Sequence, residues 1–226
     1  MSTDKFQGFD SLAVHAGQAF GPATGAVIPP VHFSTTYAQD GIGGLRQGYE
    51  YGRSGNPTRV ALETQIAALE GGVAGLSFAS GLAAEDALLR AVLTPGDEVL
   101  LGNDVYGGTY RLIARLLGPW GVGLRVVDMS DLNAVAAALG EQSVKVVWVE
   151  TPSNPLLRIT DIAGLAELAH ASGALLVVDN TFASPALQQP ISLGADVVVH
   201  SATKYLGGHS DVVGGALVFA DEDGVV

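Results

Sequence analysis

The sequence predicts an α/β fold, a mostly parallel β-sheet flanked by helices. Short apolar runs such as Val146-Val147-Trp148-Val149 and Leu175-Leu176-Val177-Val178 lack alternating polar residues, which is typical of strands buried on both faces. These runs alternate along the chain with helical patterns, the order that gives a parallel sheet covered by helices. Hydrophobic residues make up 48% of the 226 residues and charged residues 15%, which excludes a disordered chain.

The regular pattern starts at Asn56-Pro57-Thr58, an N-cap residue followed by proline at the first helical position. It predicts a helix that ends at Gly71-Gly72. Apolar runs bounded by turn residues then predict strands at residues 74–79, 98–101, 124–127, 144–149, 174–178, 196–199 and 216–219. Between the strands, we expect helices at residues 82–93, 109–117, 132–139 and 162–171.

Residues 1–57 differ from the rest of the chain. They are rich in glycine and proline and contain no periodic apolar run, so we expect an extended, irregular arm. A segment this long without regular structure usually binds a ligand or a partner subunit. We therefore predict two parts, an arm at residues 1–57 and an α/β domain at residues 58–226.

Composition excludes several classes of protein. Eleven Lys and Arg residues against 23 Asp and Glu residues give a formal net charge of −12, so we expect no nucleic acid partner. The absence of cysteine excludes disulfides and thiolate sites and suits the reducing cytoplasm. Without a signal-peptide pattern or an apolar run of about 20 residues, we expect a cytoplasmic protein with no membrane partner. The histidine spacing predicts no metal site.

Ligands of such sheets bind at the carboxyl ends of the strands, so the polar residues after each strand are informative. Lys204 follows the strand Val197–Val199 by a few residues. The strand end would take its amine partly out of water and make it nucleophilic toward carbonyls, and the hydroxyls of Ser201 and Thr203 could donate to a phosphate beside it. The alternative is a solvated loop lysine.

Two further positions suit a charged ligand. Asp179 ends another buried strand, where its carboxylate needs a partner such as a protonated pyridine nitrogen, or serves as a loop or helix-cap carboxylate. Ser80-Gly81-Leu82 links a strand to a helix, whose first N–H groups favour an anion such as phosphate, although an ordinary turn has the same sequence.

Tyr106, in a glycine-rich loop, could stack on a ring or be a turn residue. Tyr51 and Arg53 face the same side if the chain is extended, and together they suit a phosphate, although they could be a surface pair. The combined set of lysine, acid, aromatic residue and phosphate donors is what pyridoxal 5′-phosphate (PLP) requires. A nicotinamide-dependent enzyme is disfavoured because no dinucleotide-binding glycine pattern follows a strand.

Six segments resemble the Cys/Met-metabolism family of PLP-dependent enzymes, in which the cystathionine γ-synthase and γ-lyase branches are the most similar. The segments follow the family order through nearly the whole chain. They are Tyr49–Thr58, Phe78–Ala83, Asp104–Thr109, Glu150–Pro155, Val178–Thr181 and Ser201–Tyr205. The resemblance implies the large domain of fold type I of the PLP-dependent transferases.

The resemblance implies roles for the residues at the ring end of the cofactor. Lys204 is the lysine that forms the Schiff base with PLP and later moves protons. Asp179 keeps the pyridine nitrogen protonated, and Tyr106 stacks on the ring and assists as a base. Asn154 donates a hydrogen bond to the 3-oxygen of the ring.

Other residues are implied to bind phosphate or substrate. Gly81 and Leu82 give backbone N–H groups to the phosphate, next to Ser80, and Ser201 and Thr203 give hydroxyls. Tyr51 and Arg53 bind the phosphate of the cofactor in the neighbouring subunit. The resemblance therefore implies a homo-oligomer, which is at least a dimer and by family likeness a tetramer. Glu50 and Arg111 read the far end of the substrate, and Gly108 matches the cystathionine-type loop.

The resulting prediction is a PLP-dependent trans-sulfuration enzyme of the cystathionine γ-synthase type. It would replace the acyl group of an O-acylhomoserine by cysteine to give cystathionine. Cystathionine γ-lyase, which releases cysteine, 2-oxobutanoate and ammonia from cystathionine, remains an alternative with the same residues. Family members continue into a C-terminal domain that is missing here, so a truncated, non-catalytic PLP-binding fragment is the alternative of another class.

Overall fold

The computed structural model describes residues 8–21, 23–140 and 144–221. The chain divides into two compact units, residues 1–69 and 70–226, and each is described by itself. The predicted boundary at residue 57 is where the helix α2 (Pro57–Glu70) begins, whereas the two units divide between residues 69 and 70. No helix among the described residues is long and apolar enough to span a membrane.

The first unit is mostly irregular, as predicted for the arm. Isolated β-bridges join Thr36 to Tyr51 and Gln39 to Leu45. Before α2, the exception among the described residues is α1 (Phe9–His15), which was not predicted. This helix has seven residues, no side-chain N-cap and no buried residue, so its sequence carries little amphipathic signal.

The predicted start of α2 is confirmed by its capping. The Asn56 side-chain oxygen accepts hydrogen bonds from the amides of Thr58, at 2.9 Å, and Arg59, at 3.3 Å. The helix then continues to Glu70, immediately before Gly71, whose φ of 75° is left-handed and ends the helix.

The second unit contains a seven-stranded sheet in the order β1-β7-β6-β5-β4-β2-β3. Its strands are β1 (Ala74–Phe78), β2 (Glu98–Gly102), β3 (Gly123–Val127), β4 (Val144–Glu150), β5 (Leu175–Asp179), β6 (Val197–His200) and β7 (Gly215–Phe219). Every predicted strand is present within one residue at each end. The four neighbouring pairs from β6 to β3 are parallel, whereas β7 runs antiparallel to both β1 and β6. The predicted mostly parallel sheet is therefore confirmed.

The helices also follow the prediction closely. They are α3 (Gly81–Val92), α5 (Leu132–Leu139) and α6 (Ile162–Ala171). The helix expected at residues 109–117 starts earlier, as α4 (Gly107–Arg111), and continues as a π-helical segment, Leu112–Leu117, and a 3₁₀ turn, Gly118–Trp120. Two short helical segments between β5 and β6, α7 (Ser184–Leu187) and Pro190–Leu193, were not predicted.

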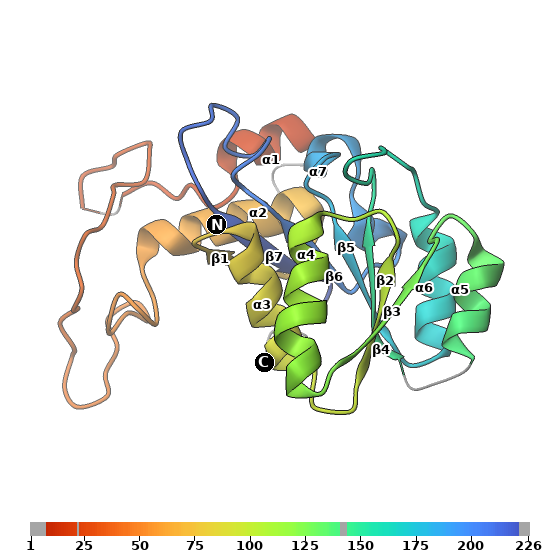
Figure 1. Ribbon diagram of the computed structural model, residues 1–226. Helices are drawn as coiled ribbons and strands as arrows, with labels where there is room; N and C mark the ends of the chain where they lie inside the picture. The colour runs from red at the N-terminus through yellow and green to blue at the C-terminus, as the bar shows by residue number, and fades with distance from the viewer. Residues whose placement is uncertain (1–7, 22, 141–143, 222–226) are drawn as a thin grey trace. The chain divides into compact units, whose positions relative to one another are not determined.

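The sheet is buried on both faces, as its unbroken apolar strands indicate. Alternate residues of β4 enter two separate cores, with Val146 and Trp148 in one and Val147 and Val149 in the other. Helices α3 and α4 cover the first face and helices α5 and α6 the second (Figure 1). Every strand except the antiparallel β7 therefore presents its carboxyl end along the same edge of the sheet.

A buried polar network holds the ends of two central strands. Glu70, which begins the second unit, is fully buried, and its Oε1 accepts a hydrogen bond from Asn180 Nδ2 at 2.7 Å. The same oxygen contacts Nε2 of His200, which is 1% exposed at the end of β6. Asn180 directly follows β5, so Glu70 ties the carboxyl ends of β5 and β6 together.

Glu70→Ala should destabilise the protein by about 3 kcal/mol, because it leaves the buried Asn180 amide and His200 ring without their shared acceptor. Urea unfolding followed by circular dichroism measures this change. Glu167→Ala removes an exposed glutamate from α6 and should change the free energy of unfolding by less than about 0.5 kcal/mol. Equal stability of the two variants would show that the network does not hold the strand ends.

Candidate active site

A cavity of about 260 Å³ lies at the carboxyl edge of the sheet in the second unit. Its lining includes every cofactor-binding or catalytic residue that the sequence predicted in this unit, namely Ser80, Gly81, Leu82, Tyr106, Asn154, Asp179, Ser201, Thr203 and Lys204. Four further residues complete the wall, namely Glu85, Glu150, Thr181 and Phe182. The structure thus brings together residues from five separate segments of the chain.

One end of the cavity suits a phosphate. Ser80 is the N-cap of α3, and its hydroxyl accepts a hydrogen bond from the Ala83 amide at 3.1 Å. The N–H groups of the first helical turn have no acceptor within the helix, and the helix dipole favours an anion there. Gly81 lies against Ser201, because a Cβ at residue 81 would be 2.9 Å from Ser201 Cβ. Glycine at this position therefore lets the helix start and the Ser201 loop form one cradle.

Gly81→Ala should open this cradle. The added methyl must displace the Ser201 backbone, which should lower the free energy of unfolding by about 1–3 kcal/mol and weaken PLP binding. Gly140→Ala is a matched control, because its Cβ would meet nothing closer than 3.6 Å. Fluorescence titration with PLP and urea unfolding of both variants measure the two effects. A Gly81→Ala protein with unchanged affinity for PLP would refute this placement of the phosphate.

The two predicted hydroxyl donors differ in the structure. The Thr203 hydroxyl accepts a hydrogen bond from the Gly214 amide at 3.1 Å and donates to the Gly214 carbonyl at 3.2 Å. Its proton is therefore already directed at Gly214. The Ser201 amide donates to Thr181 Oγ1 at 2.9 Å, which fixes the Ser201 backbone beside Gly81. Ser201 is the better placed of the two hydroxyls for the phosphate cradle.

Asp179 defines the other end of the cavity. It is 7% exposed at the end of β5, and its Oδ1 accepts a hydrogen bond from the Thr181 amide at 3.0 Å. Burial raises the pKa of Asp179, while its hydrogen bonds with Thr181 and the nearby His200 act to lower that pKa. A buried carboxylate of this kind gains from a cationic partner such as a protonated ring nitrogen.

Lys204 lines the cavity, but its surroundings differ from the prediction. It is exposed in a turn beyond the end of β6. The turn is held by hydrogen bonds from the Lys204 amide to the Ser201 carbonyl and from the Gly208 amide to the Lys204 carbonyl. The expectation that the strand end takes this amine partly out of water is wrong for the described residues. The amine also borders a second, more open cavity of about 700 Å³.

Tyr106 is held at the start of α4 by a residue that the sequence reading missed. Its amide donates a hydrogen bond to Glu150 Oε2 at 2.5 Å. The ring lies close over Gly108, where a Cβ would be only 2.1 Å from Tyr106 Cε1. Glycine at residue 108 thus permits this ring position, and Tyr106 as a residue remains 45% exposed. The signal for Glu150 was present, since it ends an apolar strand just as Asp179 does, and the two residues are paired in register.

Glu85 was also missed. It lies one helical turn after Gly81 and is 3% exposed. Burial and then the charge of Asp179 raise the pKa of Glu85 to about 8. Burial, Asp179, Glu85 and Asp104 raise the pKa of Glu150 to about 8 in the same way, against the Tyr106 hydrogen bond. The cavity therefore concentrates three carboxyl groups around its ring end.

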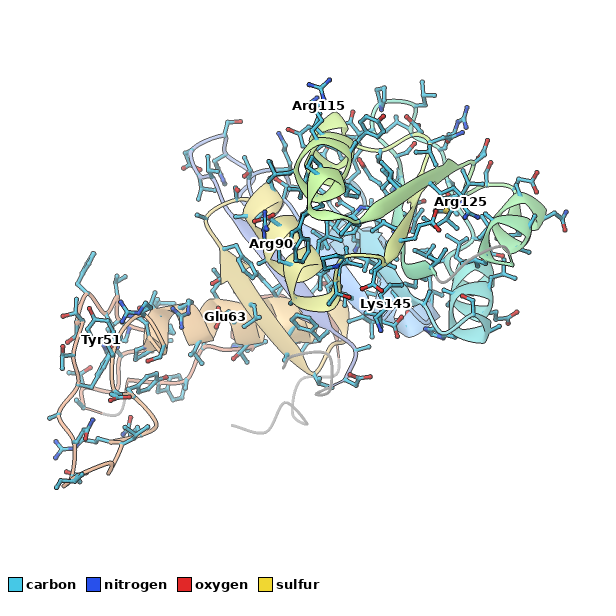
Figure 2. All side chains as sticks on the ribbon, turned by 60° about the horizontal axis from the view of Figure 1, so that its bottom comes forward. Tyr51, Glu63, Arg90, Arg115, Arg125 and Lys145 are labelled. Atoms are coloured by element: carbon cyan, nitrogen blue, oxygen red, sulfur yellow. The ribbon has the colours of Figure 1, made fainter. Side chains whose placement is uncertain are left out.

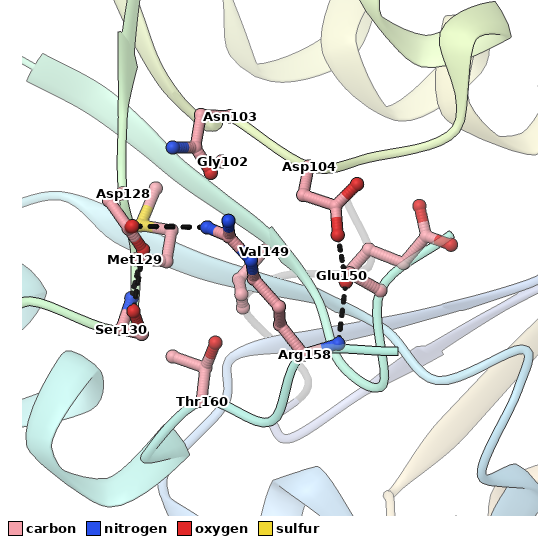
Figure 3. Close-up of a pocket in the computed structure, with 11 residues that line it drawn as sticks. Gly102, Asn103, Asp104, Asp128, Met129, Ser130, Val149, Glu150, Arg158 and Thr160 are labelled. Carbon is pink, nitrogen blue, oxygen red and sulfur yellow. Dashed lines mark hydrogen bonds and ion pairs between the residues drawn. The ribbon is translucent and has the colours of Figure 1, made fainter. Parts of the chain in front are cut away.

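A smaller pocket lies on the other side of Glu150 (Figure 3). Its cation, Arg158, is paired with Asp128 at 3.1 Å, and Ser153 is hydrogen-bonded to Asp104. The open space is about 10 Å³, which is near the volume that one water needs. Ser153 therefore holds Asp104 in this pocket, and the space is too small for a second ligand site.

Three predicted residues lie elsewhere in the chain. Tyr51 and Arg53 belong to the first unit, where the Arg53 guanidinium carbon lies 4.9 Å from the centre of the Tyr51 ring. They meet through a turn, closed by hydrogen bonds from the Ser54 and Gly55 amides to the Tyr51 carbonyl, and not through the extended chain that was expected. Glu50, also in the first unit, is exposed. The roles of all three stay predictions.

Arg111 ends α4 in the second unit and is not part of the cavity wall. Its side chain is turned back over the helix start, because its Nη1 would be 3.1 Å from a Cβ at Gly107. Arg111 is exposed. The predicted contact with the far end of a substrate is therefore not made by residues of the described cavity, and it too stays a prediction.

Comparison with known proteins identifies the family. The sequence profile described as Cys/Met metabolism PLP-dependent enzyme matches residues 10–225. The chain belongs to this family. The family resemblance, the fold class and PLP as the cofactor are thereby confirmed.

Several members of the Cys/Met-metabolism family are very similar to this chain. It is 58% identical over 211 residues to a cystathionine γ-synthase of Mycobacterium tuberculosis, a match that covers 93% of this chain and 54% of the relative. It is 53% identical over 202 residues to a cystathionine β-lyase of Lactococcus lactis, over 89% of this chain and 52% of the relative.

Solved structures of the family agree. The structure of metB from Corynebacterium glutamicum superposes with a TM-score of 0.94 at 54% identity and covers 97% of this chain and 57% of its own. A cystathionine γ-synthase from Xanthomonas oryzae pv. oryzae, in complex with aminoacrylate and cysteine, gives a TM-score of 0.92 at 48% identity, over 97% of this chain and 56% of its own. The chain spans about half the length of the relatives it matches.

Proposed function

We propose that this chain acts in a cystathionine γ-synthase reaction, in which cysteine replaces the acyl group of an O-acylated homoserine and cystathionine is formed. The observation that carries the proposal is the 58% identity to a cystathionine γ-synthase over 93% of the chain. Gly108, with the Tyr106 ring folded over it, adds support, because it matches the cystathionine-type loop.

The cofactor, when bound, supplies an electron-withdrawing ring that stabilises negative charge at the substrate α-carbon. Lys204 would hold the cofactor through its amine and would move a proton at the substrate α-carbon. Asp179 would accept a hydrogen bond from the ring nitrogen and would keep that nitrogen protonated. The Thr181 amide holds the Asp179 carboxylate in place for this contact.

The remaining residues of the cavity bind and orient. The first turn of α3 and the Ser201 hydroxyl hold the phosphate, with Gly81 allowing their close approach. Asn154 donates to the ring oxygen. Tyr106 covers the ring face from the start of α4, where Glu150 fixes its backbone. Thr203 contributes its hydroxyl only if its bond to the Gly214 carbonyl is given up.

We also propose that the protein works as a homo-oligomer of at least two subunits. Tyr51 and Arg53 form a compact cation–π pair that suits the phosphate of a neighbouring subunit. The first unit supports this assignment, because large apolar side chains of its irregular segment are exposed, including Phe20, Ile28 and Phe33.

Elimination is the second candidate function. Similar structures include a cystathionine γ-lyase from Lactobacillus plantarum at 47% identity, so closely related sequences carry different reaction names. The residues of the cavity serve either outcome. Product analysis, and not the cavity, distinguishes them.

The test is a product assay with the purified chain and PLP. O-acetylhomoserine or O-succinylhomoserine with cysteine should give cystathionine. Cystathionine alone should give little 2-oxobutanoate, the product of γ-elimination, and little pyruvate, the product of β-elimination. If a keto acid were the main product, the γ-synthase proposal would be wrong and the chain would act as a lyase. PLP binding without turnover of any substrate would instead establish a non-catalytic PLP-binding chain.

A further inference from the structure

Glu85 is the one side chain of the cavity wall for which the proposed chemistry leaves no role despite its burial. It is 3% exposed and lies in the same cavity as Asp179. Among the described residues, its Oε2 has no hydrogen-bond partner. The Thr109 hydroxyl is near enough to favour the ionised form but does not satisfy Oε2 with normal hydrogen-bond geometry. A buried, unsatisfied carboxyl oxygen is costly, so its place in a ligand cavity calls for an explanation.

The charges around Glu85 come from several elements. Asp179 at the end of β5 and Glu150 at the end of β4 are acidic, and Glu150 is also engaged by the Tyr106 amide. His200 lies behind Asp179, where its ring contacts Glu70, and Lys204 is exposed at the cavity mouth. On α3 itself, Asp86 and Arg90 pair with each other at 2.8 Å and are partly exposed.

Three carboxylates at one end of a buried cavity repel each other, so they do not all ionise together in the free protein. Burial and the Asp179 charge raise the pKa of Glu85 to about 8, so its carboxyl group is protonated at neutral pH. A positively charged pyridine ring beside Asp179 reverses the local charge and makes ionisation of Glu85 favourable.

We propose that Glu85 is a positioning residue for the cofactor ring, which holds a proton in the free protein and gives it up when the ring binds as a cation beside Asp179. The proton passes either to a neutral ring nitrogen or to the solvent. Each route leaves one Glu85 carboxylate and one cationic ring. The inference rests on the family's cofactor and not on the γ-synthase reaction, so a different product would leave it intact.

Calorimetry with pyridoxine 5′-phosphate tests this transfer. This analogue has an alcohol in place of the aldehyde, so it cannot react with Lys204, whose own proton would otherwise be counted. Titrations at about pH 7.5 in buffers of different ionisation enthalpy give the protons exchanged per ligand bound. Against wild type, Glu85→Gln should shift this number by up to about one proton toward uptake. The affinity for pyridoxine 5′-phosphate should also depend on pH differently in the two proteins. For each pH unit of increase, the affinity of Glu85→Gln should gain up to about tenfold less than that of wild type.

Asp86→Asn is the matched control, since it removes the neighbouring carboxylate of α3 outside the cavity wall. It should exchange protons as wild type does. An equal proton balance in wild type and Glu85→Gln, or an equal shift in Asp86→Asn, would overturn the proposal.

A second measurement does not depend on ligand binding. Carboxyl ¹³C NMR of glutamate-labelled protein, with the Glu85 signal assigned from Glu85→Gln, should show a titration midpoint near pH 8 in the free protein. Pyridoxine 5′-phosphate should move the midpoint down. A midpoint in the ordinary glutamate range of about 4.3 in the free protein would refute the proposal, whether or not the analogue binds.

Discussion

Lys204→Ala should abolish the visible absorbance of lysine-bound PLP and lower any turnover by at least about 10³-fold, because the amine is both the nucleophile and the group that moves the α-proton. Absorbance spectra of the purified protein with added PLP, together with the product assay, measure both effects. Lys204→Ala should change the free energy of unfolding little, because Lys204 is exposed and its truncation leaves no cavity in the core.

Lys145→Ala is the matched control for the lysine. Lys145 is exposed near the amino end of β4, away from the carboxyl edge where the cavity lies (Figure 2). This variant should bind PLP and turn over substrate as wild type does. If Lys204→Ala keeps the absorbance band and Lys145→Ala loses it, the lysine assignment is wrong.

Asp179→Asn is expected to weaken PLP binding by about 10- to 100-fold, which is the loss of a charged hydrogen bond in a buried site. Turnover should fall further, because the ring nitrogen is no longer held protonated. The asparagine oxygen can still accept the Thr181 amide, so the loop should keep its shape. Fluorescence titration with PLP and the product assay give the two numbers.

Asp131→Asn controls for the removal of one carboxylate. Asp131 is the N-cap of α5, where its side chain accepts amide hydrogen bonds that asparagine makes equally well. Its PLP affinity and stability should match those of wild type. An Asp179→Asn protein that bound PLP with wild-type affinity would remove Asp179 from the ring end of the site.

Much of the site could be predicted because short local sequence patterns mark its residues. Asp179 and Lys204 each follow an unbroken apolar run, and Ser80-Gly81 separates a strand from a helix. A parallel sheet brings such strand ends to one edge, so local patterns were sufficient to collect residues distant in sequence. The cavity at that edge bears this out.

The rest depends on packing that no local pattern records. Glu85 reads as one more acid of an amphipathic helix, and only the fold turns it toward Asp179. The engagement of the Thr203 hydroxyl by Gly214 likewise joins two loops. Lys204 lies a few residues past the end of β6, as expected, but the turn there leaves it exposed, which no local pattern records. The antiparallel direction of β7 is set by its pairing with β1 and β6, and its apolar sequence does not indicate this direction.

The position of β7 has a consequence for how the chain folds. This last strand lies between β1 and β6, and Ala74 near the start of the second unit pairs with Phe219 near its end. During synthesis, β1 cannot pair with β7 until residue 219 has left the ribosome, and closing so long a loop is slow. Gly81 directly follows β1, so the cradle it forms with Ser201 is among the last parts of the second unit to assemble. Cofactor capture should therefore report on completed assembly of this sheet.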